Sequence, residues 1–262
     1  MRVGLDIGST TIKCVVLNDA GEIVFSTYER HFSHILEKGR ALLEKVAALP
    51  GLKRLRYVTP HPKDMGPEDV AAFANIPQLC PRLHLPLQAG SDAVLKRMGR
   101  KYDSARYLEL VASLRDARPD IALSTDLIVG FPGETEEEFE ETCSLVEQVG
   151  YDSAFTFIYS PRVGTRAADM PDQIPEEVSS RRIQKLIALQ KDVTHKRYAN
   201  YIGQVHSVLV EESSRRDENQ MAGKNEYNIT VNFPGDKSLI GQIVRVKITS
   251  AGESTLRGER VE

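Results

Sequence analysis

The chain has 262 residues, a length that allows one large domain or two modest ones. Its charged fraction of 27% is ordinary, and its net charge of -3 excludes a uniformly basic nucleic-acid binder while allowing a local basic patch. Three cysteines without paired spacing argue against a disulfide framework. No apolar run reaches the roughly 18 residues of a membrane span, and no signal peptide opens the chain. We therefore expect a cytoplasmic protein without membrane contact.

The N-terminal segment, residues 1–38, predicts a short β-meander. Three apolar runs, at residues 2–7, 12–17 and 22–27, are separated by turns that contain glycine. The first turn is rich in glycine and hydroxyl groups, so its backbone N–H groups can bind a phosphate. A nearby aspartate can hold a Mg²⁺-bound water and a lysine can reach a phosphate oxygen. The residues of this phosphate-loop-like segment are Asp6, Gly8, Ser9, Thr10 and Lys13.

With YERHFS at residues 28–33, this segment resembles the ATP-dependent activators of 2-hydroxyacyl-CoA dehydratases, within the actin and Hsp70 ATPase superfamily. The resemblance implies nucleotide binding, but it covers residues 1–38 only. The second phosphate loop and the adenosine site of that fold have no counterpart in this sequence. We expect a structural hairpin, and an ATP-binding activator is the alternative function.

From residue 42 onward, strands and helices alternate, which predicts parallel β/α units. Strands are predicted at residues 54–59, 83–87, 121–129 and 152–158. Helices are predicted at residues 67–74, 92–98 and 104–117, and a capping box at Thr135 starts another. Ser91 can cap the second of these helices. Four strands cannot close a parallel barrel, so we expect an incomplete barrel over residues 42–175.

Four motifs follow one another in this region. They are TPHPKD at residues 59–64, LHLPLQAGS at 83–91, DLIVGFPGET at 126–135 and FTFIYSPR at 155–162. Together they resemble the tRNA methylthiotransferases, which are radical S-adenosylmethionine (SAM) enzymes. Within that family the similarity is to the bacterial branch that adds a 2-methylthio group to N6-isopentenyladenosine at position 37 of tRNA. The resemblance implies methylthiolation of tRNA, with SAM and a [4Fe-4S] cluster as cofactors.

Ligands of β/α barrels bind at the carboxyl ends of the strands, where these motifs fall. By the resemblance, SAM would be bound by Gln88, Ser91, Asp126, Gly130 and Phe157. Other residues of the motifs favour structural roles. We expect residues 134–141 to form a solvated acidic helix start, His84 to be a hydrogen-bonded core histidine, and Cys143 to lie on a buried helix stripe.

The cysteines do not supply the cluster that the resemblance implies. A radical SAM cluster needs three thiolates on one short loop, spaced C-x3-C-x2-C. Cys14, Cys80 and Cys143 are instead far apart in the sequence. We therefore expect no metal site, weak SAM affinity at most, and a fusion of two incomplete domains that is inactive alone. A protein partner that supplies the missing half, and a non-functional gene fusion that retains only RNA binding, are open alternatives.

The last part of the chain predicts a connecting helix over residues 176–201 and a small antiparallel β-barrel over residues 202–262. Strands are predicted at residues 206–211, 227–232, 239–248 and 252–260. This region resembles the TRAM domain, an RNA-binding module, so tRNA is the expected partner. Its candidate contacts are Lys224 and Arg257 with phosphates and Tyr227 and Phe233 with bases. Alternatively, the two aromatic rings only fill the barrel.

The predicted fold class is therefore α/β. A short β-meander precedes an incomplete parallel β/α barrel of the radical SAM type, and a small antiparallel β-barrel follows.

Overall fold

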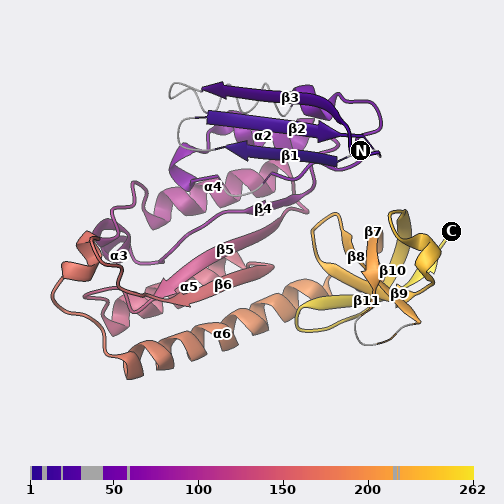
Figure 1. Cartoon of the computed structure of the whole chain (residues 1–262). Coiled ribbons are helices and arrows are strands. Elements are labelled where there is room, and N and C mark those ends of the chain that lie inside the picture. The colour runs from indigo at the N-terminus through magenta and orange to yellow at the C-terminus, as the bar shows by residue number, and fades with distance from the viewer. Residues whose placement is uncertain are drawn as a thin grey trace.

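The computed structural model describes residues 2–7, 11–18, 20–30, 44–57, 60–214, 217 and 219–262, and the side chains from Lys13 onward among them. Figure 1 shows three parts along the chain: an N-terminal sheet, a central α/β body and a C-terminal barrel joined to the body by a long helix. No helix in these ranges is long and apolar enough to cross a bilayer.

The N-terminal sheet is the predicted meander. It consists of β1 (Arg2–Ile7), β2 (Thr11–Leu17) and β3 (Ile23–Arg30), all antiparallel. The side chains of Cys14 and Val16 are fully buried and belong to the hydrophobic core of the central body. The meander therefore packs on the body through one face of β2, where Cys14 is a core residue.

The central body contains a three-stranded parallel sheet in the order β4-β5-β6. Its strands are β4 (Arg82–His84), β5 (Ala122–Val129) and β6 (Ser153–Ile158). Its helices are α2 (Pro67–Asn75), α3 (Asp92–Arg97), α4 (Ser104–Ala117) and α5 (Glu136–Val149), with short 3-10 turns at Pro62–Asp64 and Arg166–Asp169. The capping box at Thr135 is present, and Cys143 is buried on α5 as predicted.

The strand predicted over residues 54–59 is not formed by the described residues 54–57. Leu55 makes only an isolated parallel bridge to Leu79, and residues 58–59 lie outside the described ranges. A strand needs repeated backbone pairing, and this segment pairs at a single point, while the side chains of Arg54 and Arg56 bind the C-terminal barrel. β4 is also shorter than predicted, since Pro86 has no N–H to donate to a ladder.

The connecting helix is α6 (Glu176–Ala199), and a closed barrel follows it. The barrel strands are β7 (Val205–Ser213), β8 (Gln220–Asn225), β9 (Thr230–Pro234), β10 (Ile243–Ala251) and β11 (Thr255–Val261), with a 3-10 turn at Lys237–Leu239. The prediction of a purely antiparallel barrel is wrong at one place, because β9 and β11 pair in parallel.

The sequence did not predict β8, whose residues have low β-propensity. Gly223 lies in its middle because a Cβ atom there would be 2.2 Å from the carbonyl oxygen of Leu209 on β7. This glycine weakens the local strand signal and at the same time permits the close pairing of β7 and β8.

Candidate functional site

The open face of the parallel sheet carries polar and aromatic side chains. Asp126 on β5 is the register partner of Phe155 on β6, and paired residues of a sheet point to the same face. The Asp126 carboxylate lies 3.3 Å from Nε2 of His84, whose Nδ1 lies 3.1 Å from the Ser124 hydroxyl. His84 is therefore the hydrogen-bonded, mostly buried histidine that the sequence predicted.

Two aromatic rings extend this face toward the carboxyl end of β6. Phe155 and Phe157 are 55% and 51% exposed, although both lie on a strand of the central sheet. Exposed aromatic rings beside a polar group are typical of a surface that binds a ligand with an aromatic part. Phe157 is one of the predicted SAM contacts and its role stays a prediction, and Phe155 is a neighbour that the sequence prediction did not include.

Gln88 adopts a left-handed backbone conformation, with φ of 74°, at the carboxyl end of β4. Its N–H donates to the Asp126 carbonyl at 2.9 Å and its own carbonyl accepts from Ile128 at 2.8 Å. Positive φ in a residue other than glycine costs free energy and is often found at functional sites. These two bonds hold Gln88 beside Asp126, so two predicted SAM contacts are adjacent.

Gly130 and Ser91 have different surroundings from those predicted. Gly130 also has positive φ, and a Cβ atom there would lie 2.3 Å from the hydroxyl oxygen of Ser179 on α6. The close approach that this glycine permits is therefore to α6, and its N–H donates to the Glu134 carboxylate at 2.7 Å. Ser91 is buried at the N-cap position of α3, but its side chain makes no capping bond, so the predicted cap is wrong.

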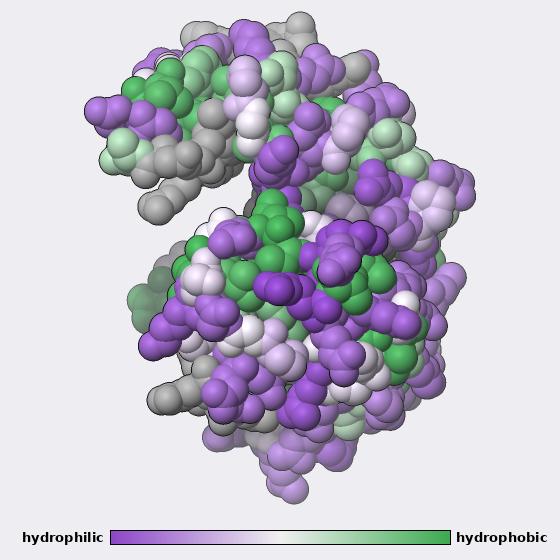
Figure 2. All heavy atoms as spheres, turned by 90° about the vertical axis from the view of Figure 1, so that its right-hand side faces the viewer, coloured by the Kyte–Doolittle hydropathy of each residue, from purple (hydrophilic) through white to green (hydrophobic). Residues whose placement is uncertain are grey.

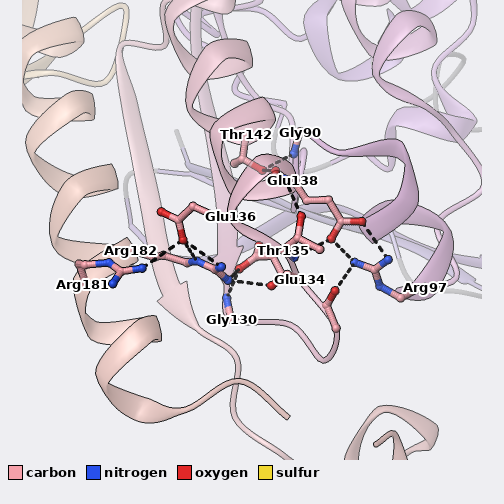
Figure 3. A network of polar contacts seen from close by, with 11 residues as sticks. Gly90, Arg97, Gly130, Glu134, Thr135, Glu136, Glu138, Thr142, Arg181 and Arg182 are labelled. Atoms are coloured by element: carbon pink, nitrogen blue, oxygen red, sulfur yellow. Dashed lines mark hydrogen bonds and ion pairs between the residues drawn. The ribbon is translucent and has the colours of Figure 1, made fainter. Parts of the chain in front are cut away.

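A buried ion-pair network ties the loop after β5 to α6 (Figure 3). The side chains of Glu134 and Arg182 are 1% and 5% exposed, and their charged atoms lie 2.9 Å apart. Burial raises the pKa of Glu134, an effect that the hydrogen bond from Gly130 and the charge of Arg182 oppose. The prediction of a solvated acidic helix start is therefore wrong for Glu134, because a basic residue distant in sequence reaches it.

Tyr159, directly after β6, has a hydroxyl group that is buried and has no hydrogen-bond partner among the described residues. Its ring lies edge-on to Phe131 of the loop after β5, with centroids 5.1 Å apart. A buried hydroxyl without a partner costs free energy that a bound polar ligand can restore. The sequence placed this tyrosine in a motif, but nothing in the sequence indicated that its hydroxyl would lack a partner.

A polar groove of 1230 Å³ runs over the C-terminal barrel, and both predicted phosphate contacts line it. Arg257 on β11 is exposed. Lys224 on β8 is half-buried, its ammonium donates to the Thr230 hydroxyl at 2.6 Å, and burial lowers its pKa. The groove also contains the acidic residues Glu211, Glu212, Asp217 and Glu253. Figure 2 shows the face that holds the barrel, where hydrophilic side chains surround a small hydrophobic patch.

The two aromatic residues predicted to contact bases are buried. Phe233 is 0% exposed and lies in the barrel core. Tyr227 donates its hydroxyl to Asp120 of the body at 2.9 Å, and its ring centroid lies 5.2 Å from that of Tyr201. Both rings are packed in the structure, which favours the alternative that they fill the barrel, and base contacts by Tyr227 and Phe233 stay a prediction.

Comparison with known proteins identifies the family. Residues 16–146 match the Radical SAM superfamily. This chain belongs to the radical SAM superfamily. Residues 199–261 match the TRAM domain, which covers the closed barrel. The radical SAM match begins within β2, so it overlaps the segment that resembled an ATPase activator.

Curated relatives are tRNA-2-methylthio-N(6)-dimethylallyladenosine synthases. The protein of Clostridium botulinum (strain Okra / Type B1) is 47% identical over 220 residues, which cover 84% of this chain and 49% of that protein. The protein of Moorella thermoacetica is 49% identical over 221 residues, which cover 84% of this chain and 50% of that protein. The resemblance to tRNA methylthiotransferases is thus confirmed, and the chain spans about half the length of the curated relatives it matches.

Among solved structures, the coproporphyrinogen III oxidase of Escherichia coli, described as a radical SAM enzyme, aligns with a TM-score of 0.47. It is 21% identical, and the alignment covers 61% of this chain and 37% of the oxidase.

The cysteines of this radical SAM chain do not fit a [4Fe-4S] cluster. Cys14, Cys80 and Cys143 are all buried and unpaired, and burial raises the pKa of each thiol, that of Cys143 to about 11. A cluster ligand must be a thiolate, which a raised pKa disfavours. In the part of the chain that the structure describes, no three His, Cys, Asp or Glu residues form a group that could hold a metal ion.

The phosphate-loop-like segment is only partly described. Asp6 and Lys13 are register partners on β1 and β2, and the Lys13 ammonium lies 5.7 Å from the ring centroid of Tyr28. Gly8, Ser9 and Thr10 lie outside the described residues. Phosphate binding by this segment stays a prediction.

Proposed function

We propose that this chain functions in the methylthiolation of tRNA, with β4, β5 and β6 as part of a radical SAM barrel and the C-terminal barrel as a tRNA-binding module. The observation that carries the proposal is the open face of the sheet that these strands form. There, Asp126 and two exposed aromatic rings lie beside the strained Gln88. The similarity to tRNA methylthiotransferases supports the substrate class, and it also supports the predicted location in the cytoplasm.

The residues of this face fit SAM, which has a polar amino-acid part and an aromatic adenine. Asp126 and Gln88 would bind the polar part, and Phe157 would lie along the adenine. Contacts of Ser91 and Gly130 with SAM stay predictions, since Ser91 is buried and the N–H of Gly130 is bound to Glu134. The Tyr159 hydroxyl would gain its missing hydrogen bond. Bound SAM would supply the methyl and 5′-deoxyadenosyl groups of a radical SAM reaction.

Radical formation is not assigned to this chain, because its three buried cysteines do not fit a cluster. We propose that the chain by itself binds SAM weakly and does not cleave it. The predicted partner protein that supplies further strands and cysteines has no support in the similarities found, and it stays a prediction.

The SAM site is tested by calorimetric titration of the full chain with SAM. We expect measurable binding that weakens about fivefold to tenfold in Tyr159→Phe, since that change removes one hydrogen bond worth about 1 kcal/mol. The matched control is Tyr28→Phe on the exposed side of the N-terminal sheet, which should leave SAM affinity unchanged. Absence of SAM binding by the wild-type chain, or equal affinities of wild type and Tyr159→Phe, would contradict the assignment.

RNA binding is tested with an in vitro tRNA transcript and filter binding over a range of salt concentrations. We expect affinity for tRNA to fall as the salt concentration rises. In Arg257→Gln, the slope of the logarithm of the binding constant against the logarithm of salt concentration should be flatter by about 0.7 to 0.9, the value of one phosphate contact. Glu253→Gln, in the same groove, should strengthen binding because it removes an acidic charge. A salt-independent signal, or the same slope in Arg257→Gln, would remove Arg257 from the interface.

A further inference from the structure

Two arginines join the central body to the C-terminal barrel. Arg54 donates to the carbonyls of Lys224 at 2.8 Å and Ser207 at 2.5 Å. Arg56 donates through one guanidinium nitrogen to the carbonyl of Asn225 at 3.0 Å. Both arginines therefore bind backbone of the barrel, and their charges lie beside the lysine of β8.

Four basic side chains gather at this junction: Arg54, Arg56, Arg82 and Lys224. Burial lowers the pKa of Arg82 and Lys224, and the charge of Arg56 lowers both further. None of the four forms an ion pair within 4.0 Å among the described residues, whereas other partly buried arginines of the body do, such as Arg97 with Glu138 and Arg197 with Asp152. We call Arg54, Arg56, Arg82 and Lys224 the junction cluster.

The second terminal guanidinium nitrogen of Arg56, Nη1, is buried and has no hydrogen-bond partner among the residues that the structure describes. Four acidic side chains act on the cluster from nearby: Glu226 on Arg54, Glu211 on Arg54 and Lys224, Glu212 on Lys224, and Asp152 on Arg82, where each raises the pKa of the basic group. Glu226 directs one carboxylate oxygen to Nδ1 of His206 at 3.2 Å. The cluster thus has like charges that repel one another and a donor that an anion would satisfy.

We propose that the junction cluster binds a backbone phosphate of tRNA, so that the RNA spans the central body and the barrel. This inference rests on the proposed function and adds to it a contact region that includes three arginines of the central body and shares Lys224 with the groove of Arg257. A guanidinium offers paired donors that suit phosphate oxygens, and a phosphate would relieve the repulsion among the four charges. Because the cluster combines residues of both parts, one phosphate there would fix the orientation of the RNA relative to the SAM site.

The experiment compares tRNA affinity of the full chain with that of Arg56→Gln, Arg82→Gln and Arg106→Gln. Arg82 donates to the Ser124 hydroxyl and makes no hydrogen bond to the described residues of the barrel, so it keeps the test valid if Arg56→Gln loosens the junction. Arg106 is an exposed arginine on α4, paired with Glu109, and is the control for loss of one positive charge. We expect tRNA to bind about tenfold more weakly to each cluster variant, and the dependence of the logarithm of affinity on the logarithm of salt concentration to be flatter by about 0.7 to 0.9. For Arg106→Gln we expect no change in either quantity.

A second titration, with inorganic phosphate followed by phosphorus NMR, separates RNA phosphate from a free anion. Phosphate binding that depends on Arg56, together with unchanged tRNA affinity in both cluster variants, would overturn the proposal in favour of a free-anion site. Binding of tRNA that depends on Arg257 but not on Arg56 or Arg82 would overturn this inference alone. If the wild-type chain binds no tRNA, the proposed function and this inference both fail.

Discussion

Replacing Arg182 with methionine should lower the free energy of unfolding by about 3 to 5 kcal/mol, because the change leaves the Glu134 carboxylate buried without its ionic partner. Arg182 also donates to the Glu134 backbone carbonyl at 3.0 Å, so one substitution removes two contacts of the loop after β5. Urea denaturation followed by circular dichroism measures the effect. The loop carries Gly130, so SAM affinity should fall in the same variant.

The control for this prediction is Glu136→Gln. Glu136 also binds Arg182, at 3.1 Å, but its side chain is 46% exposed. Exposed ion pairs contribute only about 0 to 1 kcal/mol, so this variant should be close to wild type. The double variant Glu134→Gln with Arg182→Met should recover part of the lost stability, since it leaves no buried charge. Equal losses in Arg182→Met and Glu136→Gln would contradict the assigned importance of burial.

The regular elements could be predicted because their signals are local. The capping box at Thr135 fixes the start of α5, and the predicted order of strands and helices places Asp126 within β5 and Gln88 in the segment after β4. The burial of Glu134 could not be predicted, because its partner on α6 is distant in sequence. Local pattern describes a run of acidic residues as solvated, and only the packing of α6 against the loop shows which of them is enclosed.

The junction cluster shows the same limit of sequence reasoning. Arg54 and Arg56 alternate with apolar residues, a pattern that predicts a strand with one exposed face. In the structure they bind carbonyls of β8, a strand that the sequence did not predict. Because β8 was not predicted, the binding of Arg54 and Arg56 to its carbonyls could not be predicted either. Contacts between separate parts of a chain depend on how the parts dock, and no periodicity encodes that.

Replacing Phe233 with alanine should destabilise the chain by about 3 to 5 kcal/mol, because a fully enclosed ring leaves a cavity that its neighbours cannot fill. Phe233 lies in a cluster with Val231, Met221 and Leu239, and that cluster also includes Ala122 of β5. Loss of the barrel core should therefore loosen the barrel and its contact with the body. Urea denaturation measures the loss, and Phe155→Ala, on the exposed sheet face, should cost less than about 1 kcal/mol.

The variant Phe233→Leu separates packing from RNA contact. Leucine keeps most of the apolar volume, so the barrel should fold and lose only a modest part of its stability. A ring that is enclosed by the barrel cannot stack on a base, so tRNA affinity should match that of the wild-type chain at the same temperature. Base stacking contributes about 1 to 3 kcal/mol per base. A loss of affinity of that size in a well-folded Phe233→Leu protein would show that the ring leaves the core to contact RNA.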